Sequence, residues 1–276
     1  MSVFIVTGVL GGGKSIMTVS KMREYAKEGR RIAGNIDINL KHLLRNPRSK
    51  VSYTRVPDLP TATDLDCIGR GYEGDHDEEK NGLLILDECA IWMNAREWND
   101  GRRKALINWL VHARKLGWDV YMLVQHIDMV DSQIRSALAE YIVTCHALDK
   151  IRIPIISMLW KLFTGKKKLP LPKMHAAGVV MGRASTNISV DRWFLTGSDL
   201  YKAYDTAQIF TEHYPHATHS LLSPWHLEGR FMPPALTWKG IAWRIPFLFF
   251  LMLIKVLFFG FYVVTPTGAI YERKLT

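Results

Sequence analysis

The chain has 276 residues, 48% of them hydrophobic, and is long enough to bury one large core or one domain with an appendage. Its 36 Lys and Arg residues exceed its 26 Asp and Glu residues, and the net charge of +10 favours an anionic partner, either nucleic acid or an acidic membrane surface. Three isolated cysteines lack the spacing of metal ligands, which argues against a zinc site and indicates reduced thiols at Cys67, Cys89 and Cys145.

The first segment with a functional pattern is rich in glycine. Residues 8–15 read Gly-Val-Leu-Gly-Gly-Gly-Lys-Ser and match G-x-x-x-x-G-K-[ST], between an expected strand at residues 2–7 and a helix-compatible run at residues 16–27. The backbone N–H groups of such a loop wrap the β-phosphate of a nucleotide. The lysine would bridge the β- and γ-phosphates, and the serine hydroxyl would bind Mg²⁺. The sequence therefore predicts an ATP site formed by Gly8, Val9, Leu10, Gly11, Gly12, Gly13, Lys14 and Ser15.

Strand and helix patterns then alternate to about residue 150. The run Leu-Leu-Ile-Leu at residues 83–86 is apolar throughout, as in a parallel strand that is covered on both faces. This alternation predicts an α/β fold with a parallel sheet, in which residues 1–150 form a P-loop ATPase core. Besides the elements named above, we expect strands at residues 34–38, 120–124 and 141–145, helices at residues 104–116 and 131–140, and a mobile surface loop at residues 64–81.

Two carboxylates follow the expected strand at residues 83–86. Asp87 would hold Mg²⁺ through water or Ser15, and Glu88 would orient and polarise the attacking water. A short apolar strand that ends in Asp-Glu, some 70 residues after the glycine-rich loop, is the Walker B pattern. The alternative role for Glu88 is that of an acid capping a helix.

Three more polar residues are candidates for catalysis. Gln125 follows the expected strand at residues 120–124 and would sense the γ-phosphate, or else it is a polar loop residue. Arg114 and Arg135 are candidates for an arginine finger that reaches the nucleotide of a neighbouring subunit, or else they are salt-bridged surface residues. The candidate catalytic residues are therefore Glu88, Gln125, Arg135 and Arg114.

The character of the chain changes at Ile151. Residues 151–163 are apolar and aromatic, and three lysines follow at residues 166–168. One interpretation is a hairpin that contacts the membrane, and the other is a core segment followed by a solvated loop. We treat residues 151–240 as a cytoplasmic extension and expect residues 173–235 to be irregular.

A long apolar run lies near the C-terminus. Residues 245–264 are almost entirely apolar over roughly 20 residues, the length of a membrane-spanning helix. We predict one transmembrane helix at residues 243–264, with Lys255 facing neighbouring spans in an oligomer. Because an ATPase needs cytosolic ATP, the N-terminal domain would be cytoplasmic and residues 265–276 would form a short periplasmic tail.

Several sequence blocks are similar to those of one protein family: the glycine-rich loop and residues 81–89, 98–100, 109–119, 135–140, 169–173 and 200–206. With these blocks the chain resembles the gene I assembly and export proteins of filamentous bacteriophages, which belong to the zonular occludens toxin (Zot) family. The resemblance covers most of the expected cytoplasmic part and implies a RecA-like P-loop domain related to ring-forming translocating motors.

The resemblance also implies a function and a set of partners. It implies an ATPase motor in the inner membrane of the bacterial host that drives virion assembly and extrusion of the single-stranded DNA genome. Relatives carry a larger periplasmic region, whereas only residues 265–276 follow the expected span here, so either the chain is shortened or its outer partner is held by other means. The implied partners are a homo-oligomeric ring, the phage coat proteins, the single-stranded DNA with its binding protein, the host inner membrane and an outer-membrane secretin.

Two functions remain open at this point. The first is a motor that couples ATP hydrolysis to movement of DNA or coat subunits. The second is a membrane scaffold of the assembly complex that a bound nucleotide switches without motor activity. Glu88 favours the motor, because a pure switch does not need a positioned carboxylate beside the Mg²⁺ ligand.

Overall fold

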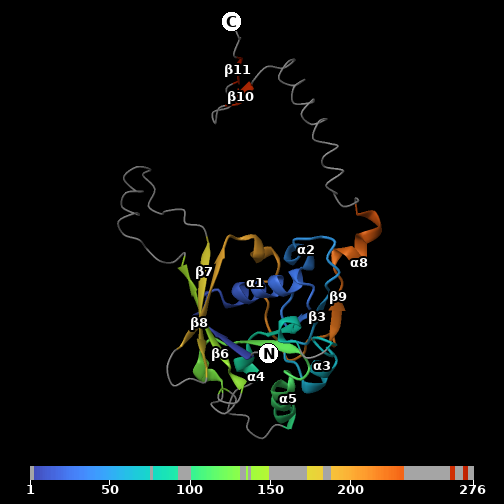
Figure 1. Cartoon of the computed structure of the whole chain (residues 1–276), viewed down its shortest axis with the longest axis vertical. Coiled ribbons are helices and arrows are strands. Elements are labelled where there is room, and N and C mark those ends of the chain that lie inside the picture. Colours follow the sequence, from blue (N-terminus) through green and yellow to red (C-terminus); the bar gives the residue numbers. More distant parts are fainter. Residues whose placement is uncertain are drawn as a thin grey trace, which may run out of the picture. The chain divides into compact units, whose positions relative to one another are not determined.

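The computed structural model describes residues 3–74, 77–92, 101–130, 135, 138–148, 173–182, 188–232, 262–264 and 270–272 (Figure 1). The chain divides into two compact units, Met1–Gly229 and Arg230–Thr276. The first unit contains a large sheet and the glycine-rich loop. In the second unit, β10 (Tyr262–Val264) and β11 (Ile270–Glu272) pair as an antiparallel hairpin.

Within the described part of the first unit, nine strands form one sheet in the order β8-β7-β6-β1-β5-β4-β2-β3-β9. The strands from β6 to β3 in this order are parallel, and β7, β8 and β9 are antiparallel additions at the two edges. The predicted α/β fold is therefore confirmed, and its sheet is mostly parallel rather than parallel throughout, because β7, β8 and β9 pair in the antiparallel sense. The strands are β1 (Val3–Thr7), β2 (Ile32–Gly34), β3 (Tyr53–Arg55), β4 (Gly82–Leu86), β5 (Trp118–Leu123), β6 (Tyr141–Ala147), β7 (Met174–Met181), β8 (Ser189–Thr196) and β9 (His219–Leu221).

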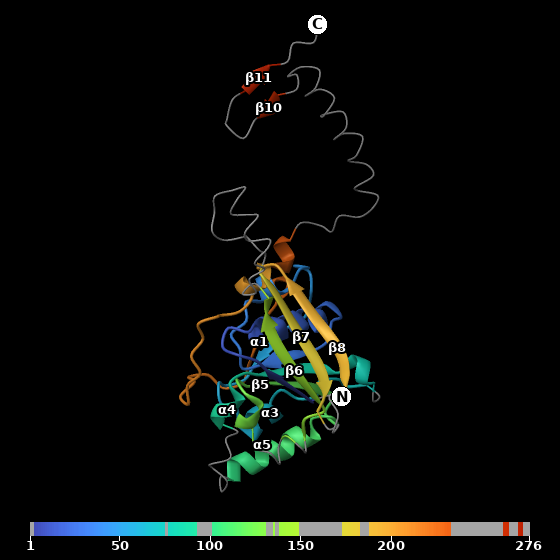
Figure 2. The ribbon, with the colours of Figure 1, turned by 90° about the vertical axis from the view of Figure 1, so that its left-hand side faces the viewer.

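Helices lie on both faces of this sheet (Figures 1 and 2). On one face, α1 (Lys14–Lys27) packs with α2 (Leu40–Leu43) and the 3-10 turn η4 (Asp199–Lys202). On the other face lie α3 (Ala62–Asp66), α4 (Cys89–Trp92) and α5 (Gly101–His112). The remaining short elements are η1 (Glu78–Lys80), η2 (Ile127–Met129), α8 (Pro224–Glu228) and η5 (Gly229–Phe231).

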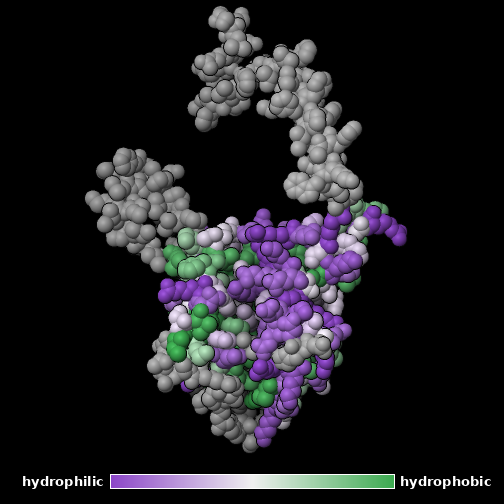
Figure 3. All heavy atoms as spheres, in the orientation of Figure 1, coloured by the Kyte–Doolittle hydropathy of each residue, from purple (hydrophilic) through white to green (hydrophobic). Residues whose placement is uncertain are grey.

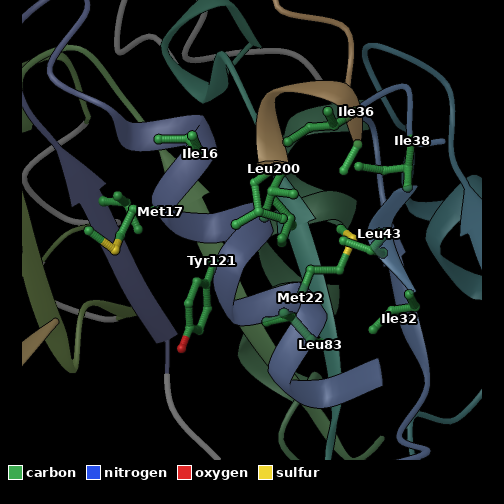
Figure 4. Packing of buried hydrophobic residues seen from close by; sticks show 14 of the residues in the cluster. Ile16, Met17, Met22, Ile32, Ile36, Ile38, Leu43, Leu83, Tyr121 and Leu200 are labelled. Carbon is green, nitrogen blue, oxygen red and sulfur yellow. The ribbon is translucent and has the colours of Figure 1, made fainter. Parts of the chain in front are cut away.

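Two apolar clusters fill the space between the sheet and these helices. Figure 4 shows the cluster under α1, where Ile16, Met17 and Met22 of the helix meet side chains from β2, β4, β5 and η4. Every residue of β4 and β5 is buried, because helices cover both faces of these central strands. This burial explains why the sequence of β4 is apolar without alternation.

Three expectations about the elements were wrong. The second strand is Ile32–Gly34 rather than residues 34–38, because the ladder with β3 and β4 ends at Gly34 and side-chain hydrogen bonds then involve Asn35 and Asp37. Part of the expected loop at residues 64–81 is ordered, since a capping box between Thr61 and Asp64 starts α3 and buries Leu65. Residues 173–235 are not mainly irregular, because β7, β8 and β9 extend the sheet.

Several expected elements lie wholly or largely outside the described residues. These are the helix at residues 131–140, the hairpin at residues 151–172 and most of the transmembrane helix at residues 243–264, including Lys255. The last three residues of that expected helix are extended, in β10. In the part of the chain that the structure describes, no helix combines the length and the apolar character needed to cross a bilayer.

Candidate nucleotide site

The glycine-rich loop joins β1 to α1 at the edge of the sheet where the parallel strands end. Gly13 is the N-cap of α1 and has a left-handed φ angle of 91°, and a Cβ atom at this position would overlap the ring of His175. A Cβ at Gly8 would lie 2.6 Å from the carbonyl oxygen of Cys145. Glycine is therefore required where the loop passes close to its neighbours. Gly13 offers no capping side chain, so no side-chain cap occupies the first N–H groups of α1, and these groups can bind an anion.

The predicted phosphate and magnesium ligands meet at the start of α1. Lys14 Nζ donates a hydrogen bond to the Gly8 carbonyl at 3.0 Å, and Ser15 Oγ donates to Asp87 Oδ2 at 3.0 Å. Burial raises the pKa of Asp87, although hydrogen bonds from the Glu88 N–H and the Ser15 hydroxyl oppose this shift. A buried carboxylate beside a hydroxyl fits Mg²⁺, which takes one or two protein oxygens and completes its shell with phosphate and water.

Glu88 has an unusual backbone conformation beside this pair. Its φ angle is +51°, in the left-handed region where a residue other than glycine costs about 1–3 kcal/mol. The Glu88 N–H donates to Asp87 Oδ1 at 2.7 Å, which holds the turn. Glu88 lines the same cavity as Lys14 and Ser15.

The other predicted catalytic residues differ in where they lie. Gln125 lines the cavity, and its carbonyl accepts a hydrogen bond from the Thr7 hydroxyl at 3.3 Å. Arg135 pairs with Asp128 at 2.9 Å, and Arg114 pairs with Glu78 at 2.8 Å. Neither arginine lines the cavity of its own chain. Arg114 lies just before β5 and hence at the edge of the sheet opposite the glycine-rich loop.

The cavity of about 360 Å³ at this site is also lined by residues for which the sequence predicted no role in the site. His175 of β7 packs against Gly13, and its Nε2 lies 2.9 Å from the hydroxyl of Tyr201. The loop of residues 204–211 forms another wall, where burial raises the pKa of Tyr204. Besides residues 11–16 of the glycine-rich loop and α1, the lining residues are Leu10, Ile36, Asp87, Glu88, Gln125, His175, Tyr201, Tyr204, Asp205, Thr206, Gln208 and Phe210.

These additional residues reach the site through antiparallel pairing and loop packing. The register of β6 with β7 places His175 opposite Ala147, at the end of β6 that adjoins the glycine-rich loop. The 204–211 loop runs beside the end of β2, where the Asp205 N–H donates to the Asp37 carbonyl at 3.1 Å. No spacing in the sequence indicates either contact, because both depend on tertiary structure alone.

Known proteins are similar to this chain over most of its length. The profile of a family described as Zonular occludens toxin (Zot) matches residues 2–175, more than half of the chain. The chain belongs to the Zot family. The resemblance inferred from the sequence blocks is therefore confirmed.

Relatives of this Zot-family protein include proteins of filamentous phages. The Gene 1 protein of Enterobacteria phage M13 is 45% identical over 240 residues, which are 85% of this chain and 67% of the M13 protein. The Gene 1 protein of Salmonella phage IKe is 44% identical over 234 residues, which are 84% of this chain and 64% of the IKe protein. The match thus spans about two thirds of these relatives.

A solved structure from the same family also aligns with the Zot-family chain. The N-terminal domain of zonular occludens toxin from Neisseria meningitidis is 16% identical and aligns with a TM-score of 0.39. The alignment covers 74% of this chain and 98% of the bacterial domain.

Proposed function

We propose that this Zot-family protein is an inner-membrane ATPase motor that drives filamentous phage assembly and extrusion of the single-stranded DNA genome. The observation that carries the proposal is the Ser15–Asp87 pair at 3.0 Å, which shares one cavity with Lys14 and Glu88. The glycine-rich loop after β1 and the acidic pair after β4 support a RecA-like P-loop domain. The names of the phage relatives support a role in the life cycle of filamentous phages.

In this proposal, different residues of the cavity have different roles in hydrolysis. Backbone N–H groups of the loop and the Lys14 ammonium would bind the β- and γ-phosphates and hold them in place. Ser15 and Asp87 would hold Mg²⁺, which supplies positive charge to the phosphate oxygens when bound. Glu88 would accept a hydrogen bond from the attacking water and so orient it toward the γ-phosphate. Gln125 would contact the γ-phosphate from the end of β5.

The location and partners of the motor belong to the same proposal. The apolar run at residues 243–264 supports an anchor in the host inner membrane, with the ATPase domain in the cytoplasm. The net charge of +10 supports an anionic partner, such as the phage single-stranded DNA released from its binding protein. A homo-oligomeric ring would act on this DNA and on the phage coat proteins, and an outer-membrane secretin would lie downstream.

The test is ATP hydrolysis by the full chain in nanodiscs, with its oligomeric mass measured by light scattering. Lys14→Ala should lose nucleotide binding. Glu88→Gln should keep nucleotide binding but lose turnover by about 100-fold or more, the usual contribution of a general base. Glu73→Gln is the matched control, because Glu73 pairs with Arg31 on the surface and lies outside the cavity.

The two functions predict different results in this assay. Turnover by a multimer that both site variants abolish would support the motor. ATP binding without turnover, even when phage DNA and coat protein are added, would contradict the motor and favour a nucleotide-switched scaffold.

A further inference from the structure

Asn35 makes an unusual set of hydrogen bonds to the residue that would hold Mg²⁺. It follows β2 directly, and its side chain is completely buried. Its Oδ1 accepts from the Asp87 N–H at 2.7 Å, and its Nδ2 donates to the Asp87 carbonyl at 3.0 Å. One side-chain amide thus satisfies both main-chain groups of Asp87. The same Nδ2 also donates to the carbonyl of Asp58 at 2.9 Å.

This contact lies just beyond the last paired residues of β2 and β4. The pairing of β2 with β4 ends at Gly34 and Ile85, so Asp87 lies beyond the ladder. The next residue, Glu88, turns the backbone into the left-handed region. Hydrogen bonds to the Asn35 amide therefore take the place of strand pairing at Asp87, where the backbone conformation sets the directions of the Asp87 and Glu88 side chains.

The side-chain amide of Gln208 links Asn35 to the wall of the nucleotide cavity. Gln208 Nε2 donates to the Asn35 carbonyl at 2.9 Å, and its Oε1 accepts from the Asp37 N–H at 2.8 Å. Gln208 belongs to the 204–211 loop, which lines the nucleotide cavity. Asp58 anchors the end of this loop, because its Oδ2 accepts from the Thr211 N–H at 3.0 Å.

We propose that Asn35 is a positioning residue for Asp87 and Glu88, and that Gln208 extends this hold to the 204–211 loop. The inference rests on the proposed ATPase function and adds two residues that act through others. Asparagine suits the position because it offers a donor and an acceptor in one plane. An aspartate there would lose the donor and place its charge against the carbonyl oxygens of Asp87 and Asp58.

The experiment compares Asn35→Asp and Gln208→Glu with a matched control, Asn46→Asp, in the full chain. Asn46 Oδ1 accepts a hydrogen bond from the Arg48 N–H at 3.0 Å, which an aspartate also does. Nucleotide affinity is measured with a fluorescent ATP analogue in EDTA and in Mg²⁺. Amide hydrogen exchange is measured at Glu88 and over residues 204–211 without nucleotide.

We expect Asn35→Asp to bind the analogue with wild-type affinity in EDTA. In Mg²⁺ its affinity should be about 10- to 100-fold below that of the wild type, as when a hydrogen-bond partner of a metal ligand is removed. Its kcat should fall by a similar factor with little change in KM. Exchange at Glu88 should become faster. Gln208→Glu should speed exchange of the 204–211 loop and lower kcat less, and Asn46→Asp should match the wild type.

Three results would overturn the inference. The first is an unchanged Mg²⁺ effect and unchanged exchange at Glu88 in Asn35→Asp. The second is an equal loss of affinity in EDTA and in Mg²⁺, which would indicate a general loss of structure. The third, decisive if Asn35→Asp does not fold, is normal exchange of the 204–211 loop in Gln208→Glu. Affinity and exchange need no hydrolysis, so a wild type without turnover would contradict the motor and leave these readouts intact.

Discussion

Gly13 lies where the glycine-rich loop, α1 and β7 meet. Its φ angle of 91° is one that residues with side chains rarely adopt, and the ring of His175 occupies the space of a Cβ atom. The position is therefore restricted twice, by its own backbone and by its neighbour. Gly101, at the start of α5, has open space at the position of a Cβ atom and no such φ angle.

Gly13→Ala should lower the free energy of unfolding by about 1–3 kcal/mol and weaken nucleotide binding, because the loop must shift to admit the methyl group. Urea denaturation and nucleotide titration measure the two effects. Gly101→Ala is the matched control and should be neutral or slightly stabilising, since alanine favours helices. Normal nucleotide affinity in Gly13→Ala would contradict the assigned loop conformation.

Arg23 joins three elements near the opposite end of α1. Its Nε and Nη2 donate to the carbonyls of Leu43 and His42, and its Nη1 lies 2.6 Å from Asp199 Oδ2 in η4. The hydrogen bond from Arg23 holds the pKa of Asp199 below its ordinary value of 3.8. A carboxyl whose pKa falls on folding stabilises the protein above its unfolded pKa and loses this effect as the pH falls through the folded value.

Asp199→Asn should therefore lower the free energy of unfolding at pH 7, and the difference from the wild type should vanish in acid, below the folded pKa of Asp199. The Asp199 side chain is 57% exposed, so solvent screening limits the effect to about 1 kcal/mol at most. Denaturation curves at neutral and acid pH measure it. A difference that persists in acid would show that the substitution disturbs packing rather than charge.

At the scale of elements, the β7–β8 hairpin presents different surfaces on its two faces. Trp193 of β8 is 7% exposed and packs against Phe4 and Tyr121, while the neighbouring Phe194 is 69% exposed. Figure 3 shows apolar residues gathered over the hairpin in this view and hydrophilic residues over the middle of the first unit. Among the described residues, the face of β8 that carries Trp193 therefore packs on the core, and the face that carries Phe194 is exposed.

Trp193→Ala should cost about 3–5 kcal/mol of unfolding free energy, because it empties a large buried volume. Phe194→Ala, the next residue on the opposite face, should change it by less than about 0.5 kcal/mol. Thermal and urea unfolding of the two variants make the comparison. Equal effects would contradict the orientation of β8.

The elements that the sequence predicted well are those with contiguous patterns. The glycine-rich loop, β4 and the Asp87–Glu88 pair follow from short motifs and from one continuous apolar run. The second strand was misplaced because Ile36 and Ile38 are buried and alternate like strand residues, although the chain there has left the ladder. His175 and Gln208 could not be predicted, since a strand register and a side-chain amide bring them to the site.

At the scale of the whole molecule, the nucleotide cavity gathers residues from both ends of the first unit. It draws on the loop after β1, the ends of β4 and β5, β7 and the 204–211 loop. A ligand that binds this arrangement and not the unfolded chain stabilises the folded state. Nucleotide binding should therefore raise the free energy of unfolding of the entire first unit.

ATP with Mg²⁺, at a concentration 100 times its Kd, should raise the free energy of unfolding by about 2.7 kcal/mol. Removal of Mg²⁺ with EDTA should reduce this gain, because the Ser15–Asp87 pair would then contribute nothing to binding. Thermal denaturation with and without ligand measures both effects. A full gain in Lys14→Ala would place the nucleotide elsewhere.

The position of Gln208 in the chain also sets when the cavity can exist. The glycine-rich loop is synthesised before the wall of the nucleotide cavity. Gln208 in this wall is encoded 200 residues after Gly8. At typical rates of synthesis this gap lasts about 10–40 s. During that time the nascent chain carries a phosphate-binding motif without the wall that completes its cavity, so the complete nucleotide cavity forms only after Gln208 has been synthesised.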